Sequence, residues 1–163
     1  AYDETNIMLG RLLAFMCQWL RERGYEAEGV PCTQSDEEDL LKSSWSHRHA
    51  GALAGLGTFG INNMIITSKG SAGRMLSFVT TAPLACDNPL EGELCLARDR
   101  GTCMGCIDRC QEGSIGRKGT GYVLDKEGCL YQIYKKKQDR KEQIDGGENC
   151  GKCSCGVYCS YFE

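Results

Sequence analysis

Nine of the chain's twelve cysteines lie between Cys95 and Cys159, and their spacing constrains the fold more than any other feature of the sequence. They follow the pattern C-x7-C-x2-C-x3-C-x18-C-x20-C-x2-C-x-C-x3-C. Close cysteine pairs with further cysteines at a distance are typical of iron–sulfur proteins, in which thiolates hold the clusters. Because each [4Fe–4S] cluster takes four thiolates, this spacing predicts two such clusters.

The cysteines divide into two sets by a rule from ferredoxins, in which the cysteine three residues after a C-x2-C pair ligates the other cluster. Cys110 therefore leaves the cluster that Cys103 and Cys106 hold. The rule predicts a first cysteine set of Cys95, Cys103, Cys106 and Cys159, and a second cysteine set of Cys110, Cys129, Cys150 and Cys153. Cys155 is left as the spare, although on this reasoning it can also replace Cys159.

Disulfides and zinc are the other common uses of many cysteines. A disulfide scaffold is typical of short secreted chains, whereas these 163 residues contain no apolar secretory segment. Zinc sites favour matched C-x2-C pairs or histidine ligands, and both histidines, His47 and His49, lie far from the cysteines in sequence. We therefore expect iron–sulfur clusters and a reducing, cytoplasmic location. A zinc-stabilised interaction module is the alternative.

Apolar content divides the chain near residues 83–95. Residues 1–88 contain apolar runs such as 8–20 and 64–67, so we expect an α/β portion with a conventional core. Residues 89–163 contain few large aliphatic side chains, so metal–thiolate bonds must replace part of the core there. We expect this second portion to be ferredoxin-like and largely unfolded without its metal.

The charge of the chain argues against a broad nucleic-acid interface, since the net charge is −3 and the isoelectric point is about 5.5. No apolar stretch reaches the roughly 18 residues of a membrane span, so we expect no membrane association. The basic run 135–141 is expected to be a solvated helix face, and a docking patch for an acidic partner or RNA is its alternative. The oligomeric state is not specified by these patterns.

Local patterns predict a mixed α/β (α+β) fold around a small sheet. The first helix is expected over 5–23, and Gly24 ends it in the left-handed conformation. Its apolar stripe consists of Met8, Leu12, Phe15, Met16 and Trp19. Further helical segments are expected at 36–41, at 49–56, after Cys103 and around 135–143. Strands are expected over 25–30, 64–67 and 74–81, and the turn-forming residues 68–73 predict that the last two pair as antiparallel neighbours.

Residues 55–60 read G-L-G-T-F-G, which matches the G-x-G-x-x-G fingerprint of dinucleotide-binding proteins. That fingerprint needs a strand before it and a helix after it, whereas the order expected here is reversed. We therefore expect a turn whose backbone approaches a flat cofactor or another part of the chain. His47 and His49 are expected to be structural, one buried and one exposed at a helix start, and Cys17 is expected in the core. Cys32 and Cys86 remain unassigned.

Three segments resemble epoxyqueuosine reductases. Residues 46–67 are similar to their A-G-L-G-x-x-G-K-N-x-L-L-I stretch, which has a related form in corrinoid reductive dehalogenases. Residues 95–115 are similar to a C-L-x5-G-x-C-x2-C-x3-C-P segment of iron–sulfur proteins grouped with them, and residues 150–162 resemble a C-G-K-C-x2-G-V-P-C-S-F ending. The resemblance implies a nitroreductase-like α/β portion followed by a ferredoxin-like portion with two [4Fe–4S] clusters. It also implies Cys159 rather than Cys155 as the ligand.

By the same resemblance, a base-off cobalamin would lie against Gly55, Gly57, Gly60 and Asn62. This chain has Ile61 in place of the family's lysine, Gln111 in place of a proline, and 40–42 (Leu-Leu-Lys) where the catalytic aspartate is expected. No catalytic residue is therefore assigned, although Asp39, His47 and His49 are substitute proton donors. We expect electron transfer through two clusters to a redox partner protein, without tightly bound cobalamin. The alternative is a cobalamin-dependent reductase acting on a small-molecule or tRNA-borne substrate.

Overall fold

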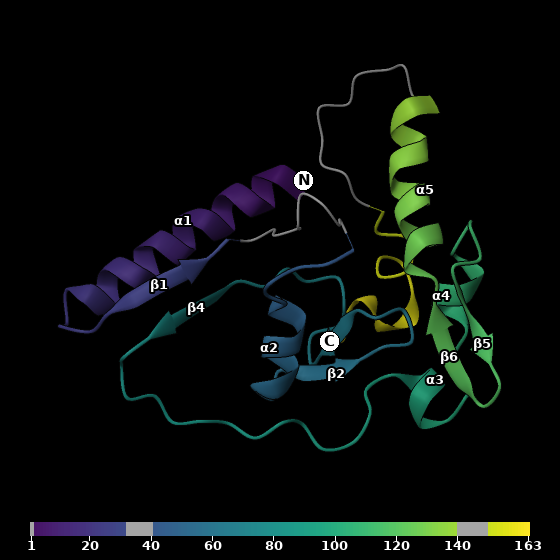
Figure 1. Cartoon of the computed structure of the whole chain (residues 1–163). Helices are drawn as coiled ribbons and strands as arrows, with labels where there is room; N and C mark the ends of the chain where they lie inside the picture. Colours follow the sequence, from purple (N-terminus) through teal and green to yellow (C-terminus); the bar gives the residue numbers. More distant parts are fainter. Residues whose placement is uncertain (1, 32–40, 140–149) are drawn as a thin grey trace.

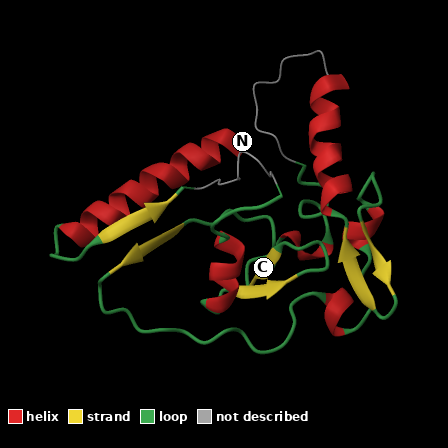
Figure 2. Cartoon of the chain, viewed as in Figure 1, coloured by secondary structure: helices red, strands yellow, loops and turns green. Residues whose placement is uncertain are grey.

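A computed structural model describes residues 2–31, 41–139 and 150–163 (Figure 1). The elements in chain order are α1 (Tyr2–Arg21), β1 (Ala27–Val30), α2 (His47–Leu53), β2 (Gly57–Phe59), β3 (Ile65–Thr67), β4 (Ser77–Thr80), α3 (Leu96–Asp99), α4 (Gly105–Asp108), β5 (Ile115–Lys118), β6 (Gly121–Leu124), α5 (Lys126–Asp139) and the 3-10 helix η1 (Tyr158–Ser160). Helices and short antiparallel strands are mixed along the chain (Figure 2). The fold is α+β, as the sequence predicted.

The described strands form three separate two-stranded antiparallel sheets rather than the one small sheet expected: β1 with β4, β2 with β3, and β5 with β6. The predicted pairing of 64–67 with 74–81 is wrong, because β3 pairs with β2 and β4 pairs with β1. The reason lies in the connecting loop. Its Ser71 and Ala72 N–H groups donate to carbonyls of the C-terminal segment, so the loop leads away from β3 instead of closing a hairpin.

The first helix, α1, packs on β1 and β4 at one end of the molecule (Figure 1). Gly24 follows it with φ of 84°, which confirms the predicted left-handed stop. The predicted apolar stripe is not the packed face, since Met8 is 67% exposed and Phe15 is 61% exposed. Cys17 and Leu20 are buried instead, because they belong to the side that contacts β1 and β4. Cys17 is thus a core residue, as expected.

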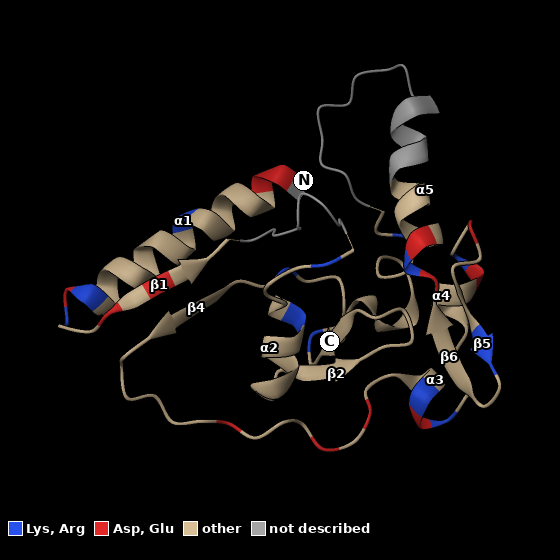
Figure 3. Ribbon diagram, in the orientation of Figure 1, with Lys and Arg blue, Asp and Glu red and all other residues tan. Residues whose placement is uncertain are grey.

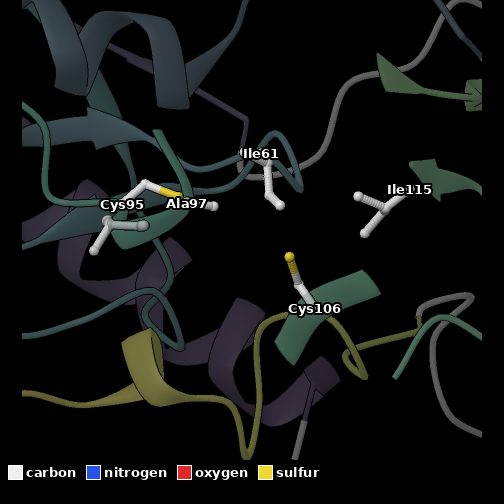
Figure 4. Close-up of a cluster of buried hydrophobic side chains, with 6 residues drawn as sticks. Ile61, Cys95, Ala97, Cys106 and Ile115 are labelled. Carbon is white, nitrogen blue, oxygen red and sulfur yellow. The ribbon is translucent and has the colours of Figure 1, made fainter. Parts of the chain in front are cut away.

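The main hydrophobic core lies on the side of α2 away from α1 (Figure 1). It contains residues from both predicted portions of the chain. Ile61 and Ile66 come from the segment around the β2–β3 hairpin, and Ile66 is only 1% exposed. They pack with buried residues of the cysteine-rich half: Cys95, Ala97, Cys106 and Ile115. Figure 4 shows the sulfur of Cys106 pointing toward Ile61. The predicted iron–sulfur portion therefore shares its core with the portion before it.

The cysteine-rich half contains elements that the sequence did not predict, namely α3 and the β5–β6 hairpin. Gly119 allows the tight turn of that hairpin, with φ of 60°. The predicted helix around 135–143 is observed as the longer α5, which begins at Lys126, and the residues after 139 lie outside the described part. The helical turn predicted at 36–41 also falls almost wholly outside it. No helix in the described part of the chain has the length and apolar character needed to cross a bilayer.

Candidate metal centre

The first cysteine set gathers around one cavity. Cys95 is the N-cap residue of α3, Cys103 comes just before α4, Cys106 lies in α4, and Cys159 lies in η1. All four line the same cavity, together with apolar side chains that include Ile61. The structure therefore brings together all four residues that the spacing rule grouped.

Electrostatics identify the same neighbours. Burial raises the pKa of Cys106 to about 12, and Cys95, Cys153, Cys159 and Cys103 add to this shift in decreasing order. Burial also raises the pKa of Cys159, and Cys95 and Cys103 contribute, while a hydrogen bond from Ser71 opposes the shift. Each thiol of the first cysteine set thus lies within electrostatic range of another member.

The second cysteine set is also close together. Burial raises the pKa of Cys153 to about 11, with further contributions from Cys129, Cys150 and Cys110. Burial raises the pKa of Cys129 as well, followed by the effects of the same neighbours, Cys150 and Cys110, and of Asp125. The structure therefore places Cys153 and Cys129 within electrostatic range of the other members that the spacing rule grouped with them. The interaction between Cys106 and Cys153 shows that the two sets are adjacent.

Raised thiol pKa values have a direct chemical consequence. At neutral pH, thiols with pKa values of about 11 to 12 stay protonated, first because burial disfavours the charged thiolate and second because neighbouring thiolates repel one another. A bound cation removes this repulsion, and each ligand then loses its proton. Four thiols are the donor set that a [4Fe–4S] cluster takes, and binding of a cluster by either set stays a prediction. Among the described residues, no three Cys, His, Asp or Glu side chains lie close enough to hold a single metal ion.

A buried hydroxyl for which the described residues provide no partner lies near the start of α5. Ser114 is 4% exposed, and its Oγ has no hydrogen-bond partner in the described part of the chain. A Cβ atom added to Gly128, the neighbour of Cys129, would lie 3.0 Å from that oxygen. Asp125 starts α5 here by accepting from the Gly128 N–H at 3.0 Å.

Hydrogen bonds from the first half of the chain hold the C-terminal cysteines in place. The Asn62 side-chain amide donates to the Cys153 carbonyl at 2.6 Å, and Asn62 Oδ1 accepts from the Met64 N–H at 3.2 Å. The Ser71 N–H donates to the Cys159 carbonyl at 2.7 Å. Asn62, which the resemblance placed beside cobalamin, is therefore a positioning residue for the loop that carries Cys153.

Other atoms of the chain occupy the space beside each glycine of the G-x-G-x-x-G segment. A Cβ at Gly57 would lie 2.1 Å from the Ile66 carbonyl oxygen, and one at Gly55 would lie 2.3 Å from the Asn88 carbonyl oxygen. A Cβ at Gly60 would lie 2.6 Å from Asn62 Oδ1. Part of this segment is strand β2 rather than a turn. Its glycines allow close approach of the chain to itself, and contact of these residues with a corrinoid stays a prediction.

The two histidines stand at the start of α2, which Ser46 caps. The His47 ring is hydrogen-bonded to Ser77 Oγ at 2.8 Å and to the Pro31 carbonyl at 2.9 Å. His49 is exposed, with Nδ1 2.7 Å from Ser46 Oγ and its ring centroid 4.8 Å from that of Phe59. These contacts give both rings structural partners.

Besides Cys17, three further cysteines belong to neither set. Cys86 is exposed in the long loop before α3, and Cys32 lies outside the described residues. Cys155 is exposed, and its sulfur is 3.9 Å from Ser154 Oγ. It does not line the cavity of the first cysteine set, whereas Cys159 does.

The structure of this chain is similar to parts of several solved structures. No family model and no curated protein sequence matches the chain. An epoxyqueuosine reductase from Bacillus subtilis superposes with a TM-score of 0.56 and 17% identity, over 91% of this chain and 37% of that one. An epoxyqueuosine reductase bound to an epoxyqueuosine-modified tRNA stem loop gives a TM-score of 0.59 and 18% identity, over 91% and 37%. This chain has the fold of part of these reductases.

A catabolic reductive dehalogenase, in complex with 3-bromo-4-hydroxybenzoic acid, gives a TM-score of 0.54 and 23% identity, over 85% of this chain and 18% of that one. These are the two enzyme families that the sequence segments resembled. The chain spans less than half the length of each of these three structures. The similarity therefore concerns a shared part of the fold.

Proposed function

We propose that this chain is an iron–sulfur oxidoreductase, epoxyqueuosine reductase-like, that transfers electrons through two [4Fe–4S] clusters. The observation that carries the proposal is the grouping of eight thiols into two adjacent sets of four, one of which lines a cavity. Similarity of fold to epoxyqueuosine reductases and a reductive dehalogenase supports the same class of chemistry.

The residues around the cysteines have defined tasks in this function. A [4Fe–4S] cluster supplies uptake and release of single electrons, at a potential that its surroundings determine. Ile61, Ile66 and Ile115 exclude water from the first cysteine set, which lowers the local dielectric constant. Adjacency of Cys106 and Cys153 gives the two sets a short connection. The protein thereby provides two electron sites side by side.

A redox partner protein is part of this proposal. Figure 3 shows basic residues on β5 and both basic and acidic residues on α3, in the half of the molecule that carries the cysteines. The two elements are linked by Arg117, which donates to the Gly101 carbonyl just after α3 at 3.4 Å. Arg98 and Lys118 are also exposed there, whereas the exposed Arg100 is ion-paired with Asp99 at 2.9 Å. An acidic electron carrier suits the basic side chains of this surface, and α3 follows Cys95 directly in the chain.

Metal analysis tests the proposed function. Protein purified without oxygen is expected to contain about eight irons and about eight acid-labile sulfides per chain, because two sets of four thiolates take two [4Fe–4S] clusters. Iron, sulfide, zinc and cobalt are counted on the same sample. Stoichiometric zinc without labile sulfide would instead identify the zinc-stabilised interaction module.

The cobalamin-dependent reductase is tested separately. We expect no tight binding of cob(II)alamin. The space that a side chain would take at Gly55, Gly57 and Gly60 already holds backbone and side-chain atoms of the chain, so it is not free for a macrocycle. Anaerobic protein is titrated with cob(II)alamin, and the EPR spectrum reports the change from base-on to base-off. Stoichiometric conversion at micromolar protein would contradict this expectation and favour the corrinoid reductase.

A further inference from the structure

One side chain outside the cysteine sets touches a predicted ligand sulfur. Ser71 lies in the loop between β3 and β4 and is 2% exposed. Its Oγ is 3.6 Å from the Sγ of Cys159 and 3.4 Å from the Ser154 carbonyl oxygen. Its own N–H is already bound to the Cys159 carbonyl at 2.7 Å. Ser71 is therefore fixed against the 3-10 helix that carries the ligand.

The Ser71 hydroxyl has one proton and two acceptors within reach. While Cys159 is a thiol, the hydroxyl satisfies the Ser154 carbonyl, and the S–H group can donate to Ser71 Oγ. When Cys159 loses its proton to become a metal ligand, the sulfur becomes an anionic acceptor with no hydrogen of its own. Hydrogen bonds to charged acceptors are roughly twice as strong as neutral ones. Ligation thus redirects the hydroxyl toward the sulfur.

We propose that Ser71 is a positioning residue that raises the reduction potential of the cluster on the first cysteine set, by donating a hydrogen bond from its hydroxyl to the Cys159 sulfur. One-electron reduction adds negative charge to the ligand sulfurs, and a donor beside one of them stabilises that added charge. Among the contacts of Ser71 Oγ in the described ranges, none is with a sulfur of the second cysteine set. The two clusters therefore differ in potential partly because of this hydroxyl. The inference rests on the proposed function, since it requires the clusters to be present.

The test is an EPR-monitored redox titration of cluster-loaded protein, in which dithionite supplies one electron per cluster. Ser71→Ala is expected to lower the reduction equilibrium constant of one cluster about tenfold, a shift of about 59 mV to lower potential, and to leave the other cluster unchanged. Ser160→Ala is the matched control. Ser160 is also buried and is adjacent to Cys159, but its hydroxyl accepts from the Val157 N–H at 2.8 Å. Its loss is expected to leave both potentials unchanged.

Equal potentials in Ser71→Ala and the unaltered protein, or equal shifts in both variants, would overturn the inference. Loaded protein with unshifted potentials contradicts this inference alone, whereas protein without iron and sulfide contradicts the proposed function. If Ser71→Ala does not retain its clusters, the unaltered protein is reduced after brief transfer to D2O and studied by ENDOR. A rapidly exchanging proton coupled to the cluster of the first cysteine set supports the hydroxyl donor, and absence of that proton overturns it.

Discussion

Replacing Cys129 by serine is expected to remove one cluster and leave the other. Roughly four of about eight irons should be lost, because Cys129 supplies one of four thiolates to the second cysteine set and none to the first. Cys95→Ser is expected to remove a similar amount of iron from the other site. The two variants are compared by iron and sulfide content and by the EPR signals that remain. Different surviving signals are expected, since each variant keeps a different cluster.

Cys155→Ser is the matched control for these two variants. Like them it removes one thiol, but Cys155 is exposed and lies outside the cavity that Cys159 lines. Both clusters should remain in Cys155→Ser and one should be lost in Cys159→Ser. The reverse result would show that Cys155 is the ligand. Loss of both clusters from Cys129→Ser alone would contradict the division into two independent sets.

Removing the iron is expected to unfold more of the chain than the cysteine-rich half. In small metal-dependent domains, metal binding contributes on the order of 10 kcal/mol to folding. The main core contains the buried side chains of Cys95 and Cys106. Without the metal, the core loses the iron that these two sulfurs are proposed to bind. Ile61 and Ile66 belong to the same core, and the β2–β3 hairpin should therefore open with residues 89–163. This extends the expectation from the sequence, which limited unfolding to the second portion.

Amide hydrogen exchange before and after anaerobic chelation measures this effect. Exchange should accelerate strongly across 57–67 and across the described part of 89–163. Helix α1 serves as the internal control, because it packs on β1 and β4 through a separate cluster of Cys17, Leu20 and Ala27. Unchanged exchange at Ile66 after removal of the iron would show that the aliphatic side chains hold the core without the metal.

The sequence was most informative about features that depend on residues close together in the chain. Spacing alone grouped the cysteines into the two sets that lie together in the structure, and Gly24 was identified from its place after a helical pattern. Whether these cysteines bind clusters stays a prediction. The spacing of ligands is informative because short C-x2-C segments restrict which sulfurs can reach one centre.

Strand pairing was less predictable, because it depends on contacts far away in the chain. Residues 68–73 have the composition of a hairpin turn, yet the N–H groups of Ser71 and Ala72 bind the C-terminal segment instead. The packed side of α1 was similarly unpredictable from periodicity. Its large side chains, such as Phe15, remain exposed, while the smaller Cys17 is buried against β1 and β4. Neither partner is visible in a local window of sequence.

The hydrogen bonds that fix the C-terminal cysteines also have a consequence for the rate of folding. Ser71 and Cys159 are 88 residues apart, and Asn62 and Cys153 are 91 residues apart. Contacts over such separations form late, because closing a long loop costs chain entropy before any contact compensates it. Cys103 and Cys106 are three residues apart in sequence, so we expect them to come together before Cys159 reaches them. During that interval the thiols are open to oxidants, so the yield of intact centres depends on how fast the C-terminal segment docks.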